Sequence, residues 1–380
     1  MKKTIYLDYN ATTPIDPEVA KEMIPYIESF YGNPSSSYSI GRSNKEAVEK
    51  ARGQVAGLIN CQPEEIYFTS CATESNNLAI KGIAWANSEK GRHIITSEIE
   101  HPAVTEVCKH LSSQGFEITY LPVDQYGRVN PEQIKGAIRP DTILITIMHA
   151  NNEVGTIQPI QEIGAIARKN NIVFHTDASQ SVGKIETDVD KLGVDLLTIA
   201  GHKLYAPKGI GALYIRKGTR IENLMHGGGQ EKGIRPGTEN VIHTVGLGKA
   251  CEVAMRDFKQ NQYNMQLSRD RLLRGLVSQL GNKVHVNVDL GNCLPNTLSV
   301  AFEKVSAHTL ASFISSDVLI STGSACHSGE TTISSVLQAM NIDFRTAAAT
   351  VRISTGKLTT TEEIDFAVEA LVNAVKKLSL

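Results

Sequence analysis

Residues 172–203 read IVFHTDASQSVGKIETDVDKLGVDLLTIAGHK, and the order of apolar and polar segments in them indicates the architecture. Ile172–His175 and Val194–Ile199 are short apolar runs of the length expected for buried strands. The same alternation of strand-like and helix-like segments extends over the larger, N-terminal part of the chain. This βαβ pattern predicts an α/β fold in which helices cover both faces of a mostly parallel sheet.

Segments on either side of this stretch follow the same pattern. Ser43 and Glu46 form a predicted capping box before a helix with apolar residues Ala47, Ala51, Val55 and Leu58. The other expected elements are strands over 66–69, 142–148 and 211–215, a helix with Leu78, Ala79, Ile83 and Ala86 on one side, and a helix after Pro159 with Ile163, Ile166 and Ala167.

The C-terminal part of the chain has a different pattern, in which short strand-like segments alternate with polar residues. We therefore expect a large cofactor-binding domain over residues 15–260. Residues 1–14 and 261–380 would form a smaller α+β domain that carries the loop around Cys326. The expected elements of that domain are strands over 283–288, 297–302, 318–321 and 350–354, and a helix capped by Thr360 and Glu363 with Ile364, Val368, Leu371, Val375 and Leu378 on its apolar side.

Composition and charge exclude several classes of protein. The 380 residues are 41% hydrophobic and 21% charged, as in an ordinary water-soluble protein. A formal net charge of −2 gives no electrostatic reason to expect binding to nucleic acid or to an anionic membrane. Met1-Lys2-Lys3 precedes an apolar segment far too short for an export signal. We expect two domains, a cytoplasmic location and no membrane association.

The cysteines form no recognisable metal or redox motif. They stand at positions 61, 71, 108, 251, 293 and 326, and no two are spaced as C-x-x-C. Zinc ligation is therefore not expected, and a disulfide framework is improbable in a large chain without an export signal. Five of the six are interpreted as structural cysteines, and Cys326 is the exception.

Two charged residues follow neighbouring predicted strands. Asp177 comes directly after one strand and Lys203 after the other, and the carboxyl ends of parallel strands line one crevice. A lysine there can form a Schiff base with an aldehyde cofactor, and an aspartate can keep a pyridine nitrogen protonated. The alternative is a buried Asp–Lys ion pair, which is costly to bury for structure alone.

Residues 66–77 read IYFTSCATESNN, which predicts a strand, a tight polar turn and the start of a helix. The free N–H groups and the dipole of a helix N-terminus favour a phosphate. Ordinary capping by Thr73 or Ser75 is the competing interpretation. Asn151-Asn152-Glu153 follows another predicted strand and places amide side chains at the same crevice.

Taken together, these motifs resemble the cysteine desulfurases, which are class V, fold-type I enzymes dependent on pyridoxal 5′-phosphate (PLP). The resemblance is to the nitrogenase and iron–sulfur-cluster group and extends over nearly the whole chain. The motifs that carry it are YLDYNATTP (6–14), GNPS (32–35), TSCATESNN (69–77), EHPAV (100–104), MHANNEVG (148–155), HTDASQ (175–180), GHK (201–203), RPGT (235–238) and VRIS (351–354).

The resemblance implies a role for each cofactor-binding position. Lys203 would hold PLP as a Schiff base and transfer protons, while His101 would stack on the pyridine ring and also handle protons. Asp177 would pair with the ring nitrogen, and Gln180 would bind the phenolate oxygen. The remaining positions implied are Ala72, Thr73 and His202 at the phosphate, together with Asn152 and Ala200.

Substrate and subunit contacts are implied in the same way. Arg352, helped by Asn33 and Asn152, would bind the α-carboxylate of L-cysteine, a task that suits a bidentate guanidinium. Thr238 matches a threonine that reaches the phosphate from the neighbouring subunit, which implies a homodimer.

Cys326 lies in a segment, residues 321–335, that is rich in Ser, Thr and Gly and reads STGSACHSGETTISS. This is the composition of a mobile loop, not of a packed core. The resemblance implies that Cys326 takes sulfur from cysteine as a persulfide, releases L-alanine, and passes the sulfur to an acceptor protein. A cluster scaffold, a tRNA-thiolation enzyme and a DNA-modification protein all remain open as acceptors.

Two features depart from the common family pattern. His327 replaces a small polar residue, where it would either lower the pKa of the thiol or be an ordinary solvated histidine. The sequence ends at Leu380, so we do not expect the tail with which many family members dock a scaffold. The alternative functions are a selenocysteine lyase, another PLP-dependent lyase or transaminase, and a catalytically silent binding subunit.

Overall fold

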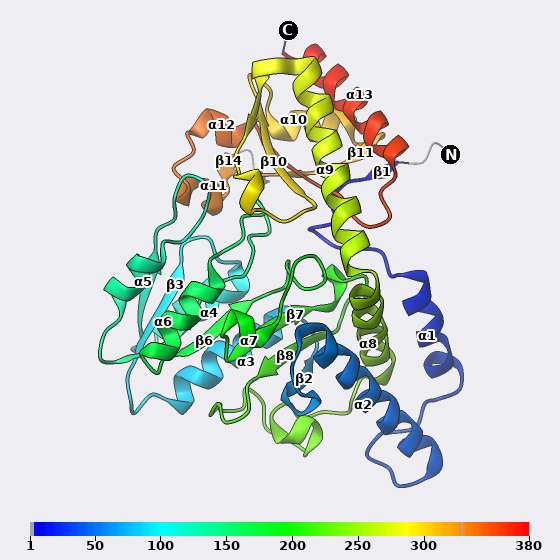
Figure 1. Ribbon diagram of the computed structural model, residues 1–380, viewed down its shortest axis with the longest axis vertical. Coiled ribbons are helices and arrows are strands. Elements are labelled where there is room, and N and C mark those ends of the chain that lie inside the picture. The colour runs from blue at the N-terminus through cyan, green and yellow to red at the C-terminus, as the bar shows by residue number, and fades with distance from the viewer. Residues whose placement is uncertain (1–3, 328–329, 380) are drawn as a thin grey trace.

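The structure is a computed structural model that describes residues 4–327 and 330–379, with side chains outside 324–332 (Figure 1). Its larger sheet has the strand order β2-β8-β7-β6-β5-β3-β4. The five strands from β7 to β4 are parallel, and β8 is antiparallel to both of its neighbours. The strands are β2 (Ile66–Thr69), β3 (His93–Ser97), β4 (Glu117–Leu121), β5 (Thr142–Thr146), β6 (Val173–Asp177), β7 (Leu196–Ala200) and β8 (Gly211–Ile215).

Helices cover both faces of this sheet, as the alternating pattern predicts. Adjacent strand residues such as Ile94 and Ile95 point to opposite faces and enter two separate hydrophobic cores. Helices α3 (Ala72–Ala86) and α4 (Pro102–Ser112) pack on one face. The core on the other face includes residues of α1 (Pro17–Glu28), α2 (Ser39–Ile59), α5 (Pro131–Ala137), α6 (Ile160–Lys169), α7 (Val189–Leu192) and α8 (Val241–Arg256).

A third core lies around a smaller antiparallel sheet of order β12-β15-β10-β9. Figure 1 shows α9 and α13 beside this sheet, at the end of the molecule where the C-terminus lies. The elements of this part are β1 (Ile5–Tyr6), α9 (Phe258–Leu280), β9 (Val284–Val286), β10 (Thr297–Phe302), α10 (Ala307–Ile314), β11 (Val318–Leu319), β12 (Ser321–Thr322), β15 (Thr350–Ser354) and α13 (Thr361–Leu378).

Two connections tie the smaller part to the larger one. The N-terminal segment begins in the smaller part with β1, which pairs with β11 so that Ile5 and Leu7 enter the third core, and it then continues to α1 of the larger part. The short helices α11 (Ser335–Ala339) and α12 (Phe344–Ala348) instead pack their apolar residues into a core of the larger sheet. A separate two-stranded hairpin, β13 (Ser324–His327) and β14 (Glu330–Ile333), precedes them. The predicted division of the chain at residue 260 falls in the first turn of α9 and stays a prediction.

Local details confirm one predicted cap and contradict the other. Thr360 and Glu363 form the capping box at the start of α13. Ser43 and Glu46 do not cap a helix, because α2 already begins at Ser39 and both side chains are exposed on its surface. The earlier start follows from burial: Gly41 and Asn44 pack inward, which extends the buried side of the helix by a full turn. In the described part of the chain, no helix is long and apolar enough to cross a membrane.

Candidate active site

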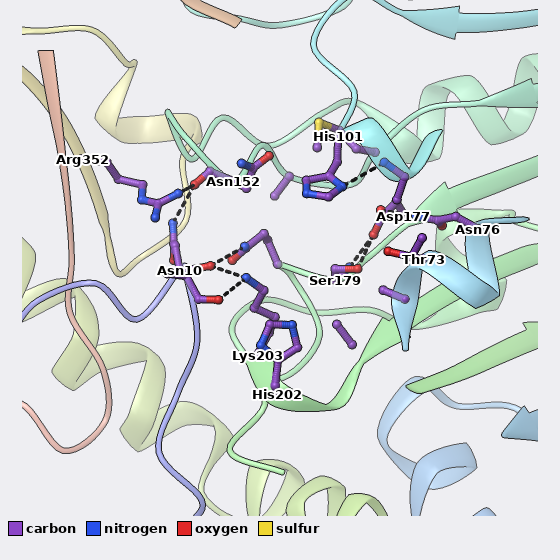
Figure 2. Close-up of a pocket in the computed structure, with 17 residues that line it drawn as sticks. Asn10, Thr73, Asn76, His101, Asn152, Asp177, Ser179, His202, Lys203 and Arg352 are labelled. Carbon is purple, nitrogen blue, oxygen red and sulfur yellow. Dashed lines mark hydrogen bonds between the residues drawn. The ribbon is translucent and has the colours of Figure 1, made fainter. Parts of the chain in front are cut away.

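A cavity of about 320 Å³ opens at the carboxyl ends of β6 and β7 and at the N-termini of α3 and α4 (Figure 2). Arg352 of β15 closes it from the smaller part of the molecule. The structure therefore confirms a crevice at the carboxyl ends of parallel strands, and it adds a residue of the smaller sheet to that crevice. The predicted residues that line the cavity are Ala72, Thr73, His101, Asn152, Asp177, Gln180, Ala200, His202, Lys203 and Arg352.

Lys203 lies in the turn that follows β7 and points its amino group into the cavity. Its Nζ donates to the carbonyl oxygens of Asn10 at 2.5 Å and Ala11 at 2.7 Å (Figure 2). Burial, and next the nearby guanidinium of Arg352, lower the pKa of Lys203 to about 8. A larger fraction of this amine is therefore neutral near pH 7 than is usual for lysine, as a nucleophile or proton acceptor requires.

Asp177 is the last residue of β6, and its buried carboxylate accepts hydrogen bonds at both oxygens. One oxygen accepts from the side-chain amide of Asn76 at 2.7 Å, and the other accepts from the backbone N–H and the hydroxyl of Ser179. Three donors fix the carboxylate in place while it still lines the cavity. Asn76 and Ser179 are site residues that the sequence analysis missed.

His101 caps α4 and lies across the cavity from Lys203 in the view of Figure 2. Its Nδ1 accepts from the backbone N–H of Ala103 at 3.1 Å. Loss of solvent around the ring lowers its pKa, an effect that Asp177 opposes and the cation of Lys203 reinforces. Because Nδ1 is the acceptor, the neutral ring carries its proton on Nε2, where it can be donated.

Arg352 projects from the middle of β15 and is held at two points. One terminal nitrogen donates to a carboxylate oxygen of Asp8 at 2.7 Å and the other to the carbonyl oxygen of Asn152 at 2.8 Å. Its Nε is buried and has no partner among the described residues. A cation that is anchored in this way, and still lines the cavity, is suited to bind a carboxylate.

Asn10 connects the groups around Lys203, although its motif was noted in the sequence without a role. Besides receiving the Lys203 hydrogen bond, it donates through Nδ2 to the hydroxyl of Thr297 at 2.8 Å and to the Asn152 carbonyl at 3.2 Å. Its side-chain oxygen accepts from Asn296 at 3.0 Å. This one residue therefore joins the N-terminal segment to both sheets, a role that no local sequence pattern indicates.

The N-terminus of α3 borders the cavity through Ala72 and Thr73. Helix α3 has Cys71 as its N-cap, without a side-chain capping bond, and Thr73 and Ser75 lie inside the helix, so the predicted alternative of capping by either residue is wrong. His202 lies nearby, and burial followed by three lysine charges lowers its pKa to about 4. Neutral His202 can donate one hydrogen bond, and the helix start supplies N–H groups and a positive dipole end.

Two predicted residues lie outside this cavity. Asn33 is exposed, and its side-chain oxygen accepts from the backbone N–H of Ser35 at 2.9 Å. Thr238 is also exposed and does not line the cavity of its own chain. Their proposed contacts with the substrate and with a partner subunit therefore stay predictions.

The cysteines differ in how far they are buried. Burial raises the pKa of Cys61 and of Cys108 to about 12, and it also raises the pKa of Cys251 and Cys293. Such thiols stay protonated and unreactive near neutral pH. The backbone of Cys326 lies in β13, opposite Thr331 of β14, whereas its side chain and that of His327 lie outside the described residues. Within the described part of the chain, no group of three or more His, Cys, Asp or Glu side chains could hold a metal ion.

Comparisons with known proteins agree with this geometry. The pattern of the family described as aminotransferase class-V matches residues 5–366. The chain is 48% identical to the cysteine desulfurase IscS of Methanosarcina thermophila over 377 residues, which cover 99% of this chain and 93% of that protein. It is also similar to the solved structure of a NifS-like protein, with a TM-score of 0.93, 41% identity, and coverage of 99% and 100% of the two chains. A structure of SspA in complex with cysteine matches with a TM-score of 0.81 and 40% identity, covering 94% of this chain and 100% of that one.

Proposed function

Since the chain belongs to the aminotransferase class-V family and, within it, to the cysteine desulfurases, we propose that it converts L-cysteine to L-alanine and takes the sulfur onto Cys326 as a persulfide. The observation that carries the proposal is the meeting of Lys203, Asp177, His101 and Arg352 around one cavity. Enzymes of this family depend on PLP.

The residues of the cavity fit PLP. Lys203 supplies an amine for the Schiff base, buried Asp177 supplies an anion for the ring nitrogen, and the start of α3 supplies donors for the phosphate. When bound, PLP provides an electron sink that stabilises negative charge on the carbon beside the amino group of the substrate. Its other contacts would be His101 against the ring, Gln180 at the phenolate oxygen, and Ala72, Thr73, Asn152, Ala200 and His202 around it.

Side chains of the protein would carry out substrate binding and proton transfer. Arg352 would hold the α-carboxylate and so orient the substrate, while Lys203, with its lowered pKa, would accept and return the proton of the α-carbon. The Nε2 proton of His101 would serve proton transfer on the opposite side of the cavity. The family resemblance assigns these roles, and the distances described above support them.

Sulfur transfer requires a thiolate of the enzyme that attacks the sulfur atom of the substrate. In the proposed step the S–S bond forms between Cys326 and the substrate sulfur as the carbon–sulfur bond of cysteine breaks. The electron pair of that bond stays with the carbon fragment, and its protonation yields L-alanine. The four thiols with raised pKa are unsuited to this attack, which supports the assignment to the cysteine of the hairpin.

The partners and location are also proposals. We infer a homodimer in which Thr238 of each subunit reaches the other subunit's phosphate site. A sulfur-acceptor protein would take the sulfur from Cys326, and the enzyme would work in the cytoplasm without direct contact with nucleic acid.

The proposed function is tested by assaying alanine and enzyme-bound persulfide after adding L-cysteine to the PLP-loaded protein. We expect both products from the wild type and from Cys71→Ala, and neither from Cys326→Ala. Persulfide formation by Cys326→Ala at the wild-type rate would contradict the assignment of the acceptor. Activity on selenocysteine alone would identify a selenocysteine lyase instead, and transfer of the amino group to a keto acid would identify a transaminase.

A further inference from the structure

Lys184 is a buried lysine whose amino group faces two neutral oxygens. Its Nζ donates to Oε1 of Gln180 at 3.0 Å and to Oδ1 of Asn10 at 3.4 Å. The residue is only 5% exposed, and among the described residues it forms no ion pair with a carboxylate. Burying an amino group without an opposite charge is costly, so the two amide oxygens must compensate for its lost hydration.

The local chain geometry places Lys184 beside Gln180. A hydrogen-bonded turn follows β6, in which Val182 donates to the carbonyl of Ala178, and Lys184 donates to the carbonyl of Ser181. Positions four residues apart in such a turn lie on the same side, which brings the two side chains into contact. Gln180 lines the active-site cavity, whereas Lys184 lies behind it.

Two contacts determine which way the Gln180 amide points, one with Lys184 and one with Asn10. Protonated lysine has donors only, so Gln180 must turn its carbonyl oxygen toward Lys184. The NH2 group then points the other way and donates to the carbonyl oxygen of Asn10 at 3.0 Å. Its second N–H has no protein partner in the described part of the chain and is available to the cavity.

The charges around Lys184 come from the active site itself. Burial, followed by the cations of Lys203 and Arg352, lowers the pKa of Lys184 to about 7. The neutral amine still has two N–H donors, one for each of the two amide oxygens that it faces, so it can make the same two hydrogen bonds.

We propose that Lys184 is a positioning residue that holds the Gln180 amide with its NH2 group toward the phenolate oxygen of PLP. The inference rests on the proposed function, because it assumes that PLP occupies the cavity. With the amide reversed, Gln180 would present a carbonyl oxygen to an anionic oxygen, and the two would repel each other. Lys184 thus acts on the cofactor through Gln180 and does not itself line the cavity.

The test is a pH titration of the visible absorbance of the PLP-loaded protein without substrate. A donor to the phenolate stabilises its deprotonated form, so its loss in Lys184→Met should raise the pKa of the absorbance change by about one unit. Lys184→Gln, which keeps an N–H donor, should show a smaller shift. The control Lys191→Met removes an exposed lysine of α7 and should titrate as the wild type.

A double-mutant cycle separates a positioning role from a direct one. Gln180→Leu alone should raise the same pKa, and adding Lys184→Met to it should change the pKa by less than about 0.3 units, because the effect of Lys184 passes through Gln180. The proposal would be overturned if Lys184→Met shifted the pKa of the absorbance change as much in the Gln180→Leu protein as in the wild type. It would also be overturned if Lys184→Met alone titrated with the same pKa as the wild type. If Lys184→Met does not fold, the comparison of Lys184→Gln with and without Gln180→Leu decides the question.

This test is independent of the overall reaction. A wild-type protein that binds PLP but forms no alanine from cysteine would contradict the proposed function and leave the titration interpretable. A protein that binds PLP nowhere would show no visible absorbance and would contradict both.

Discussion

The cofactor cavity and the Cys326 hairpin are built in opposite ways. In the cavity the two cationic side chains are each held by two partners from distant parts of the chain, Lys203 by Asn10 and Ala11, and Arg352 by Asp8 and Asn152. Among the described residues, strands β13 and β14 pair only with each other, in a sheet separate from the two larger ones.

The hairpin is attached at its base. Gly323 donates to the carbonyl of Thr350, Ser334 donates to the carbonyl of Gly323, and the Ser334 hydroxyl donates to the half-buried carboxylate of Glu153. Carbon chemistry at the cofactor needs fixed geometry, whereas a sulfur carrier must meet first a substrate and then an acceptor. The chain thus places its anchored charged side chains and the proposed sulfur carrier on different sheets.

The largest effect is expected from removal of the Lys203 amino group. Lys203→Ala should bind PLP without the covalent link, lose the absorbance band of the Schiff base and form no detectable alanine from cysteine, because no other described lysine lines the cavity. Absorbance spectra and an alanine assay measure both losses. Retention of the wild-type spectrum would show that another residue holds the cofactor.

Arg352→Ala should affect the substrate more than the cofactor. Loss of a charge-assisted contact of about 1.5–3 kcal/mol corresponds to a rise in KM for cysteine of roughly 10- to 100-fold, with PLP affinity changed little. Steady-state kinetics and a PLP titration provide the two measurements. The matched control is Arg345→Ala, an exposed arginine of α12, which should saturate as the wild type does. Unchanged saturation in Arg352→Ala would refute its role in carboxylate binding.

A third variant tests how the stability of the folded protein depends on pH through Glu100, the residue before the cavity-lining His101. Glu100 is buried beside His101, and burial raises its pKa to about 8. The folded protein therefore keeps this proton up to about pH 8, whereas the unfolded chain releases it above about pH 4.5, so stability falls as pH rises between these values. Glu100→Gln imitates the protonated acid and should be more stable than the wild type at pH 8, with the difference much reduced at pH 5.

Chemical denaturation of both proteins at the two pH values measures this effect. An equal difference in the free energy of unfolding at pH 5 and pH 8 would mean that Glu100 is ionised in the folded protein throughout this range. Activity is not needed for this measurement.

The smallest expected effect is on the stability of the hairpin variant. Cys326→Ala should abolish sulfur transfer while changing the free energy of unfolding by no more than about 0.5 kcal/mol, since in the described part of the chain β13 pairs only with β14. Cys251→Ser, which puts a hydroxyl into the core beneath α8, should destabilise the protein clearly more. Thermal melting of the two variants compares them directly, and a large loss in Cys326→Ala would contradict the contrast between hairpin and cavity.

The positions of Asp177 and Lys203 could be derived from sequence because they depend on local periodicity and strand direction. Apolar runs of strand length predict the strands, and parallel pairing alone brings their carboxyl ends to one edge. The structure confirms that both residues line one cavity. The roles of His101, Arg352 and Cys326 came mainly from the family resemblance, since their positions in the sequence do not predict that they lie close together in the fold.

The contacts that complete the site depend on tertiary structure. Asn10 reaches Lys203 across 193 positions, Asp8 reaches Arg352 across 344, and Asn76 reaches Asp177 across 101. Such pairs produce no periodic pattern in the sequence, because the residues around each partner favour the same secondary structure whether or not the other partner is present. Even Lys184, only four residues from Gln180, could not be recognised as a buried amine, since the local sequence is equally typical of an exposed turn. Burial and hydrogen-bond direction exist only once distant segments have packed together, and they determine what each of these side chains can do.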